Sequence, residues 1–320
     1  MNNIKIIKNR SDIGAGTRGA DLGVDAIEIA AINAKNDYFE RFDYIDLQTF
    51  NEAIYEKQNT TYALRIGKVL KVCEGLSNAV TSSLNENNFP LVLSGDHSSA
   101  LGTISGVKCA FPGKRVGVVW IDAHADIHSP YTTPSGNIHG MPLAAALADD
   151  NMDRKVNNVS EETLKNWEGM KNIGGISPKV LHSDIVYFGV RSTEEPEDYT
   201  IEKHGIKNYK VEEVRYRGMD VCVAEALDRL KDCDVIYISF DVDSMDCDLI
   251  SKGTGTPVSK GFDQEEIKQI INKIIASGKV ACIEVVEVNP CLDNKGNVMA
   301  ETAFDVINDF TKSIEKYCIK

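Results

Sequence analysis

The stretch RVGVVWIDAHADIHSP, residues 115–130, joins an apolar run to a group of ionisable side chains. Its valines, tryptophan and isoleucine are typical of a strand that is buried on both faces. Asp122, His124 and Asp126 then follow at every second position. Unpaired charges of this kind cost several kcal/mol in a protein interior, or their pKa values shift. The stretch therefore predicts a buried strand that ends in a site where something neutralises these groups.

Other strand-like runs alternate with segments of helical periodicity along the chain. The helical segments include residues 64–87 and 263–277, and in the second we expect Asp263 to cap the helix together with Glu266, with Gly278 as a left-handed exit. The remaining strand-like runs are residues 90–95, 183–191, 234–243 and 279–288. This alternation predicts an α/β fold with a parallel sheet covered by helices on both sides.

Composition and charge restrict the class of protein. A chain of 320 residues with 42% hydrophobic content can bury the core of one large domain, which we expect to span residues 1–320. The net charge of −13 argues against nucleic acid and anionic membranes as partners and weakly favours a small cationic substrate. The N-terminal residues lack the apolar segment of a signal peptide, so we expect a cytoplasmic protein. The eight cysteines form no C-x-x-C pair, and we interpret them as reduced residues of the core.

Several strands end in residues that can bind metal ions. The carboxyl ends of parallel strands open onto one edge of a sheet, where ligands bind. The candidate ligands are His97, Asp122, His124, Asp126, Asp241 and Asp243. Two divalent cations would use all six residues if carboxylates bridge them, and four carboxylates balance the charge of +4. Oxygen and imidazole donors without a thiolate favour Mn²⁺ over Zn²⁺. Taken singly, each fragment is also compatible with a helix cap or a solvated turn.

Four blocks carry a resemblance to a known family. They are SGDHS (94–98), DAHADIHSPYTTPSGNIHG (122–140), SFDVDSMD with GTGTPV (239–258) and EVVEVNP (284–290). Together they resemble the ureohydrolase (arginase/agmatinase) family, and the second block is most similar to arginases. The resemblance implies a three-layer α/β/α fold with a mainly parallel sheet, two Mn²⁺ ions per subunit, hydrolysis of a guanidino group to urea, and a homotrimer or homohexamer. By position, the family's metal ligands fall on the same six residues, with Asp122 and Asp241 as the bridging carboxylates.

The chemistry of such a site assigns further roles. A guanidinium carbon is a poor electrophile, so the reaction needs a metal-bridging hydroxide, which coordination makes available near neutral pH. By resemblance, Glu287 holds the guanidinium group, and His139 delivers a proton to the leaving amine. Asp126 counts as a catalytic residue as well as a ligand. Glu284 should face the opposite side of its strand, toward a helix or partly toward solvent.

The distal part of the substrate is marked less clearly. By resemblance to arginases, the substrate contacts are Thr133, Ser135 and Asn137 for an α-carboxylate, Glu194 and Glu197 for an α-ammonium group, Thr256 near the nucleophile, and His128. Glu194 stands in place of the usual Asp and His128 in place of the usual Asn, although an imidazole can still donate a hydrogen bond.

These contacts predict hydrolysis of L-arginine to L-ornithine and urea. The alternatives are another amidinohydrolase, acting on agmatine, guanidinobutyrate or formimidoylglutamate, and a non-catalytic oligomer that the metals stabilise. Two further histidines, His182 and His204, fall outside every block, and the sequence assigns them no role.

Overall fold

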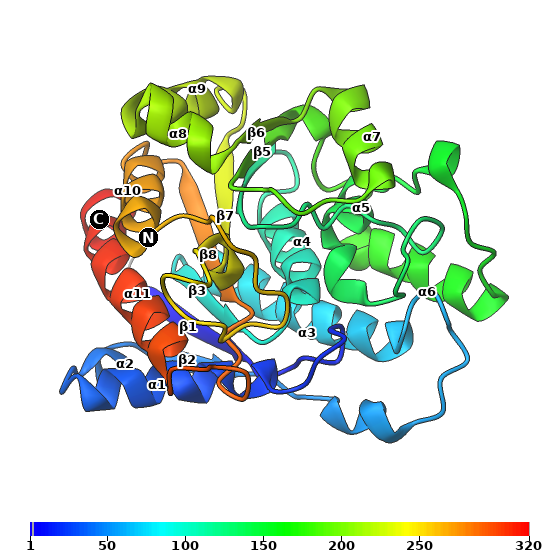
Figure 1. Cartoon of the computed structure of the whole chain (residues 1–320), viewed down its shortest axis with the longest axis horizontal. Coiled ribbons are helices and arrows are strands. Elements are labelled where there is room, and N and C mark those ends of the chain that lie inside the picture. The colour runs from blue at the N-terminus through cyan, green and yellow to red at the C-terminus, as the bar shows by residue number, and fades with distance from the viewer. Residues whose placement is uncertain (2, 320) are drawn as a thin grey trace.

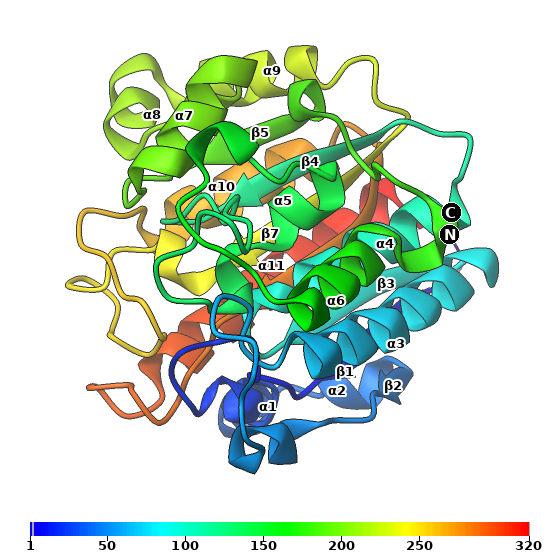
Figure 2. The ribbon, with the colours of Figure 1, turned by 90° about the vertical axis from the view of Figure 1, so that its right-hand side faces the viewer.

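The computed structural model describes residues 1 and 3–319, and its centre is an eight-stranded sheet in which all neighbouring strands are parallel. The strand order is β2-β1-β3-β8-β7-β4-β5-β6. Figure 1 labels every strand except β4, which is labelled in Figure 2. The strands are β1 (Ile4–Asn9), β2 (Tyr44–Asp46), β3 (Phe89–Ser94), β4 (Val116–Ile121), β5 (Ile185–Phe188), β6 (Lys207–Tyr209), β7 (Val235–Asp241) and β8 (Val280–Val286). The predicted α/β class is confirmed.

Helices cover both faces of this sheet, which gives three layers (Figures 1 and 2). The first hydrophobic cluster joins one face to α1 (Gly23–Asn33), α2 (Tyr38–Arg41), α8 (Val211–Arg217), α9 (Met219–Arg229), α10 (Gln264–Ile275) and α11 (Val298–Tyr317). The second joins the other face to α3 (Ile66–Asn85), α4 (Ala100–Ala110), α5 (Pro142–Leu147) and α6 (Glu161–Lys171). Helix α7 (Glu195–His204) lies between β5 and β6 in the chain. The three-layer α/β/α prediction is therefore confirmed.

Strand β4 shows why the central strands are apolar throughout. Val119 and Ile121 belong to the first hydrophobic cluster, whereas Val118 and Trp120 belong to the second. Successive side chains of a strand point to opposite faces, and here both faces lie under helices. A continuous apolar run is the result.

All five predicted strands are present, and the helix that begins after Asp263 is capped as expected. The Asp263 carboxylate accepts the Glu266 N–H at 2.8 Å, and the Glu266 carboxylate accepts the Asp263 N–H at 2.8 Å. Gly278 has a φ of +71°.

The sequence analysis missed β1, β2 and β6. Lysines interrupt the apolar pattern of β1, yet Lys8 is only 5% exposed because its ammonium group pairs with Glu28 at 2.6 Å.

The cysteines are all free, but their interpretation as core residues holds only in part. Five are buried, Cys109 and Cys318 are half-buried, and Cys291 is exposed. Within the described part of the chain, no helix has the length and apolar character that crossing a bilayer requires.

The strand order brings the predicted site together. Strands β3, β8, β7 and β4 are consecutive neighbours at the centre of the sheet, and each is followed at its carboxyl end by candidate site residues. Because the strands are parallel, these residues share one edge.

Candidate metal centre and substrate pocket

The six candidate ligands converge at the carboxyl edge of the central strands. His97 begins the short helical turn after β3, Asp122 directly follows β4, and Asp241 is the last residue of β7. Each of the six except His124 is buried, and His124 is half-buried. The structure thus places together the residues that the sequence selected at three separate strand ends.

Three carboxylates surround the His97 imidazole. Its Nδ1 atom lies 3.0 Å from Asp122 Oδ2, 3.0 Å from Asp126 Oδ2 and 3.1 Å from Asp241 Oδ2. These contacts are close without being aligned as hydrogen bonds, since His97 Nδ1 and Asp122 Oδ2 are buried and have no hydrogen-bond partner among the described residues. A divalent cation fits between buried nitrogen and oxygen atoms that point at one another in this way, because each can bind it as a ligand atom.

A second group adjoins the first through Asp122. His124 Nδ1 lies 3.0 Å from Asp243 Oδ2 and 3.6 Å from Asp122 Oδ1. The two oxygens of Asp122 thus face different imidazoles, which fits its predicted bridging position. Asp241 differs, because its Oδ1 accepts the Asp243 N–H at 2.8 Å and only its Oδ2 faces His97. Its bridging role stays a prediction.

The pKa values in this cluster reflect an excess of buried negative charge. Burial alone would lower the pKa of His97, but Asp122, Asp126 and Asp241 raise it well above the usual value. Burial and the charge of Asp122 raise the pKa of Asp126 to about 6. Burial and the charges of Asp243 and Asp122 raise the pKa of Asp241 well above its ordinary value. The raised pKa values mean that bound protons reduce the repulsion between these carboxylates, and divalent cations would reduce it further.

Two residues behind the cluster fix the His97 ring. Trp120 stacks on it with ring centroids 4.1 Å apart and an interplanar angle of 5°. Ser239 Oγ lies 2.7 Å from His97 Nε2, the ring nitrogen that faces away from the carboxylates. The sequence analysis missed Ser239. Its signal is a hydroxyl inside an apolar strand, two positions before Asp241 and therefore on the same face.

Glu287 and His139 form a buried pair beside the ligands. Glu287 Oε1 accepts the His97 N–H at 2.9 Å and lies 3.1 Å from His139 Nδ1. Its Oε2 atom is buried and has no hydrogen-bond partner among the described residues. Burial would lower the pKa of His139, but Glu287 raises it to about 9.

The backbone at this edge of the sheet is strained. Asp126 has a φ of +50° and Glu287 a φ of +67°, in the left-handed region that side chains with a Cβ rarely adopt. Such conformations cost about 1–3 kcal/mol each and persist where the surrounding structure imposes them, often at functional sites. The Glu287 N–H, for example, is held by the Gly95 carbonyl at 2.7 Å.

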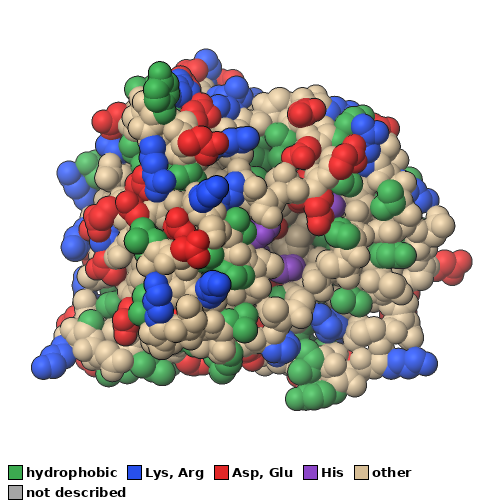
Figure 3. All heavy atoms as spheres, viewed as in Figure 1, with side chains coloured by type: hydrophobic (Ala, Val, Ile, Leu, Met, Phe, Trp, Pro, Cys, Tyr) green, Lys and Arg blue, Asp and Glu red, His purple; other side chains and the backbone are tan. Residues whose placement is uncertain are grey.

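A cavity of about 320 Å³ opens above these groups, which is large enough for a small molecule. In Figure 3, histidine side chains are visible inside a hollow of this face, and acidic side chains lie near its rim. Four of the six candidate metal ligands line its floor: His97, His124, Asp126 and Asp241. Asp122 and Asp243 do not line it. Its walls include His139, Glu287 and every predicted substrate contact: His128, Thr133, Ser135, Asn137, Glu194, Glu197 and Thr256.

His128 is already engaged on both sides of its ring. Its Nδ1 lies 3.0 Å from Thr132 Oγ1, and its Nε2 lies 2.5 Å from Glu194 Oε2. Donating a hydrogen bond to a substrate, as the sequence suggested, therefore requires His128 to release Thr132 or Glu194. Glu197 is likewise occupied, because its carboxylate accepts the N–H groups of Ile127 at 3.3 Å and Glu194 at 3.2 Å.

Thr256 and Glu284 complete the surroundings. The Thr256 hydroxyl donates to Asp243 Oδ2 at 3.1 Å, so it contacts a candidate ligand directly. Glu284 faces a helix, as expected, because its partner Ser99 is the N-cap residue of α4, but the alternative of partial exposure to solvent is wrong. Its side chain is fully buried and accepts the hydroxyls of Ser94, Ser99 and Tyr237, each at 2.7 Å. These three hydroxyl groups donate the hydrogen bonds that water would otherwise give to this carboxylate.

Comparison with known proteins supports the assignment of the fold and identifies the family. The model of the Arginase family matches residues 2–312. The arginase of Bacillus subtilis is 35% identical over 306 residues, which are 95% of this chain and 96% of that protein. The solved arginase structure from Bacillus caldovelox has a TM-score of 0.80 at 33% identity, covering 97% of this chain and 98% of that one. The structure of Entamoeba histolytica arginase in complex with L-ornithine has a TM-score of 0.80 at 28% identity, covering 96% and 97%. The chain belongs to the arginase family.

Proposed function

We propose that this protein hydrolyses L-arginine to L-ornithine and urea. The observation that carries the proposal is the free oxygen of Glu287, which is buried beside the candidate metal ligands and in a wall of the pocket. A buried carboxylate oxygen without a partner is costly unless a donor completes it. A guanidinium group offers planar N–H donors to this oxygen, and its positive charge balances the carboxylate.

The six clustered residues are proposed to hold two Mn²⁺ ions. When bound there, such ions supply a Lewis acid and a nucleophilic water near neutral pH. The chain's own contribution is to fix the ligands: Trp120 and Ser239 hold the His97 ring, and Thr256 holds Asp243. Glu287 then binds the guanidinium group, whose carbon must lie above the floor of the pocket.

His139 is the proposed proton donor. Its pKa of about 9 keeps the ring protonated near neutral pH, and the ring lies in the wall of the pocket. The contact with Glu287 fixes its position next to the group that holds the substrate. Transfer of its proton to the departing amine makes that amine a better leaving group.

The outer wall of the pocket suits an amino acid. Within the loop, Thr133 Oγ1 accepts the N–H groups of Ser135 and Gly136, and Ser135 Oγ accepts the Asn137 N–H, so the two hydroxyl hydrogens are free to donate. We propose that they bind the α-carboxylate, and that Glu194 and Glu197 attract the α-ammonium group. The curated relatives bear the name arginase, and one solved relative holds L-ornithine, which is the amino-acid product of this reaction. We further propose one catalytic domain and a homotrimer or homohexamer, on the family resemblance.

A substrate panel tests the proposal. Protein loaded with Mn²⁺ should release urea from L-arginine far faster than from agmatine or guanidinobutyrate, and should release no formamide from formimidoylglutamate. His139→Asn serves as the matched control, because it should lose turnover in the same assay without losing metal. Activity confined to a substrate without an α-carboxylate would refute the arginine assignment. Absence of product from every substrate would favour a non-catalytic, metal-stabilised protein.

A further inference from the structure

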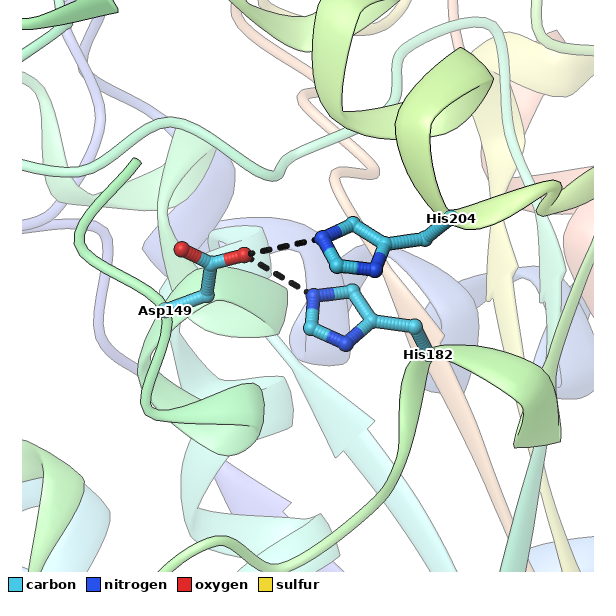
Figure 4. Close-up of side chains that lie close together, drawn as sticks. All are labelled: Asp149, His182 and His204. Carbon is cyan, nitrogen blue, oxygen red and sulfur yellow. Dashed lines mark hydrogen bonds and ion pairs between the residues drawn. The ribbon is translucent and has the colours of Figure 1, made fainter. Parts of the chain in front are cut away.

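Two histidines and one aspartate form a compact cluster outside the pocket. Asp149 follows α5, His182 lies just before β5, and His204 is the last residue of α7. Figure 4 shows both imidazole rings with one edge turned toward the same carboxylate. None of the three lines the substrate pocket. The tertiary fold alone brings them together, since they come from three separate segments.

The distances in the cluster match those between the ligands of one metal ion. Asp149 Oδ2 lies 2.9 Å from His182 Nε2 and 3.7 Å from His204 Nε2, and all the ligand atoms lie within 4.8 Å of one another. Tetrahedral Zn²⁺ with bonds of about 2.0–2.1 Å separates its ligand atoms by about 3.3 Å. The two measured separations lie on either side of this value.

The carboxylate is oriented and ionised. Asp149 Oδ1 accepts the Asn151 N–H at 2.8 Å, which leaves Oδ2 directed at the imidazoles. The hydrogen bond with His182 lowers the pKa of Asp149 to about 2, although burial opposes this. Among the described residues, neither ring makes a hydrogen bond or ion pair with any group other than Asp149. The donor atoms are therefore not committed to another part of the fold.

We propose that Asp149, His182 and His204 form a second metal site, separate from the catalytic centre, for a dication of intermediate softness such as Zn²⁺. Two imidazoles and one carboxylate are a common protein ligand set for this ion, with water in the fourth position. The side chains are 23–28% exposed, so the ion and a water molecule have access from solvent. An ion bound here joins the end of α5, the start of β5 and the end of α7.

The rings must turn when the ion binds. They are stacked with centroids 3.6 Å apart and an interplanar angle of 12°. Imidazole lone pairs lie in the ring plane, so those of two nearly parallel rings do not converge on one point. We expect each ring to rotate about its Cβ–Cγ bond when the ion binds, since both side chains are partly exposed. In the structure, the shared carboxylate of Asp149 contacts both stacked rings.

Metal counting on the Mn²⁺-loaded protein tests the site. Zn²⁺ is added, excess ion is removed, and both metals are measured by elemental analysis. Any Zn²⁺ that replaces Mn²⁺ in the catalytic centre is recognised because the Mn²⁺ count falls by the same amount. The wild-type protein should hold one further Zn²⁺ per chain. His204→Phe keeps a stacked ring without a ligand nitrogen, and it should weaken binding of that ion by more than about tenfold.

Matched variants separate this site from the catalytic centre. Lys203→Ala removes a neighbouring charge that pairs with Asp153, not with the cluster, and it should retain the further Zn²⁺. His204→Phe should retain the urea release of the wild type, so a failure of the proposed function is distinguishable from a failure of this inference. Equal Zn²⁺ counts in the wild type and His204→Phe would overturn the proposal. The cluster would then be a carboxylate that contacts two imidazoles and binds no metal.

Discussion

Removal of one hydroxyl behind the metal cluster should weaken metal binding without touching a ligand. In the structure, His97 Nδ1 faces three carboxylates, so a ring that binds metal through Nδ1 carries its proton on Nε2. That proton is donated to Ser239 Oγ at 2.7 Å, at a residue with no solvent exposure. In Ser239→Ala, the Nε2 proton loses this acceptor at a position that solvent does not reach.

The size of the effect follows from this contact. Partners of metal-bound histidines typically contribute about 10–100-fold to metal affinity or activity, which corresponds to about 1.4–2.7 kcal/mol. A buried donor without an acceptor also lowers the free energy of unfolding by about 1–3 kcal/mol. We therefore expect Ser239→Ala to bind Mn²⁺ about 10–100-fold more weakly, with a lower Tm in the metal-free protein.

Competition with a chelator of known affinity measures the change in Mn²⁺ binding. Ser105→Ala is the matched control, because Ser105 is also fully buried and its hydroxyl donates to the Leu101 carbonyl at 2.6 Å within α4. It should bind Mn²⁺ like the wild type. A Ser239→Ala protein with Mn²⁺ affinity within about twofold of the wild type would refute the assignment of Nδ1 as the ligand atom.

Other perturbations have distinct expected outcomes. Asp241→Asn should lose metal and urea release together, whereas His139→Asn should keep metal by elemental analysis and lose most turnover; equal metal loss in both would contradict their separate roles. Burial lowers the pKa of Lys179 from its usual 10.5 to about 8 in the folded protein. Between these two pH values the unfolded chain binds more protons at this residue than the folded protein does. The free energy of unfolding should therefore rise with pH across this window. The unfolding free energy of the wild type relative to Lys179→Met should thus increase by roughly 3 kcal/mol from pH 8 to 10.5, and a flat difference would argue against a neutral buried amine. Asp263→Ala removes a helix cap and should lower stability by about 1 kcal/mol, measured by urea denaturation, while an unchanged midpoint would mean that the cap contributes nothing.

The sequence by itself determined the parallel α/β architecture and the six candidate ligands. Both depend on local patterns: strands buried on two faces are apolar throughout, and parallel strands carry their site residues at one end. Asp122 directly follows such a strand, Asp241 ends one, and His97 lies three residues beyond one, so their convergence could be predicted without knowledge of the strand order. The resemblance of the sequence blocks added Glu287 and His139.

Only the tertiary structure decided the features that depend on distant neighbours. Strand β8 lies between β3 and β7, which places Glu287 against the His97 backbone and leaves one of its oxygens free. The burial of Glu284 depends on hydroxyls from two other strands and the turn after β3, and Lys8 is buried in β1 through an ion pair with α1. His182 and His204 carry no local signal at all, because their common partner Asp149 comes from another segment. Such contacts are set by how the layers pack, and side-chain periodicity does not encode them.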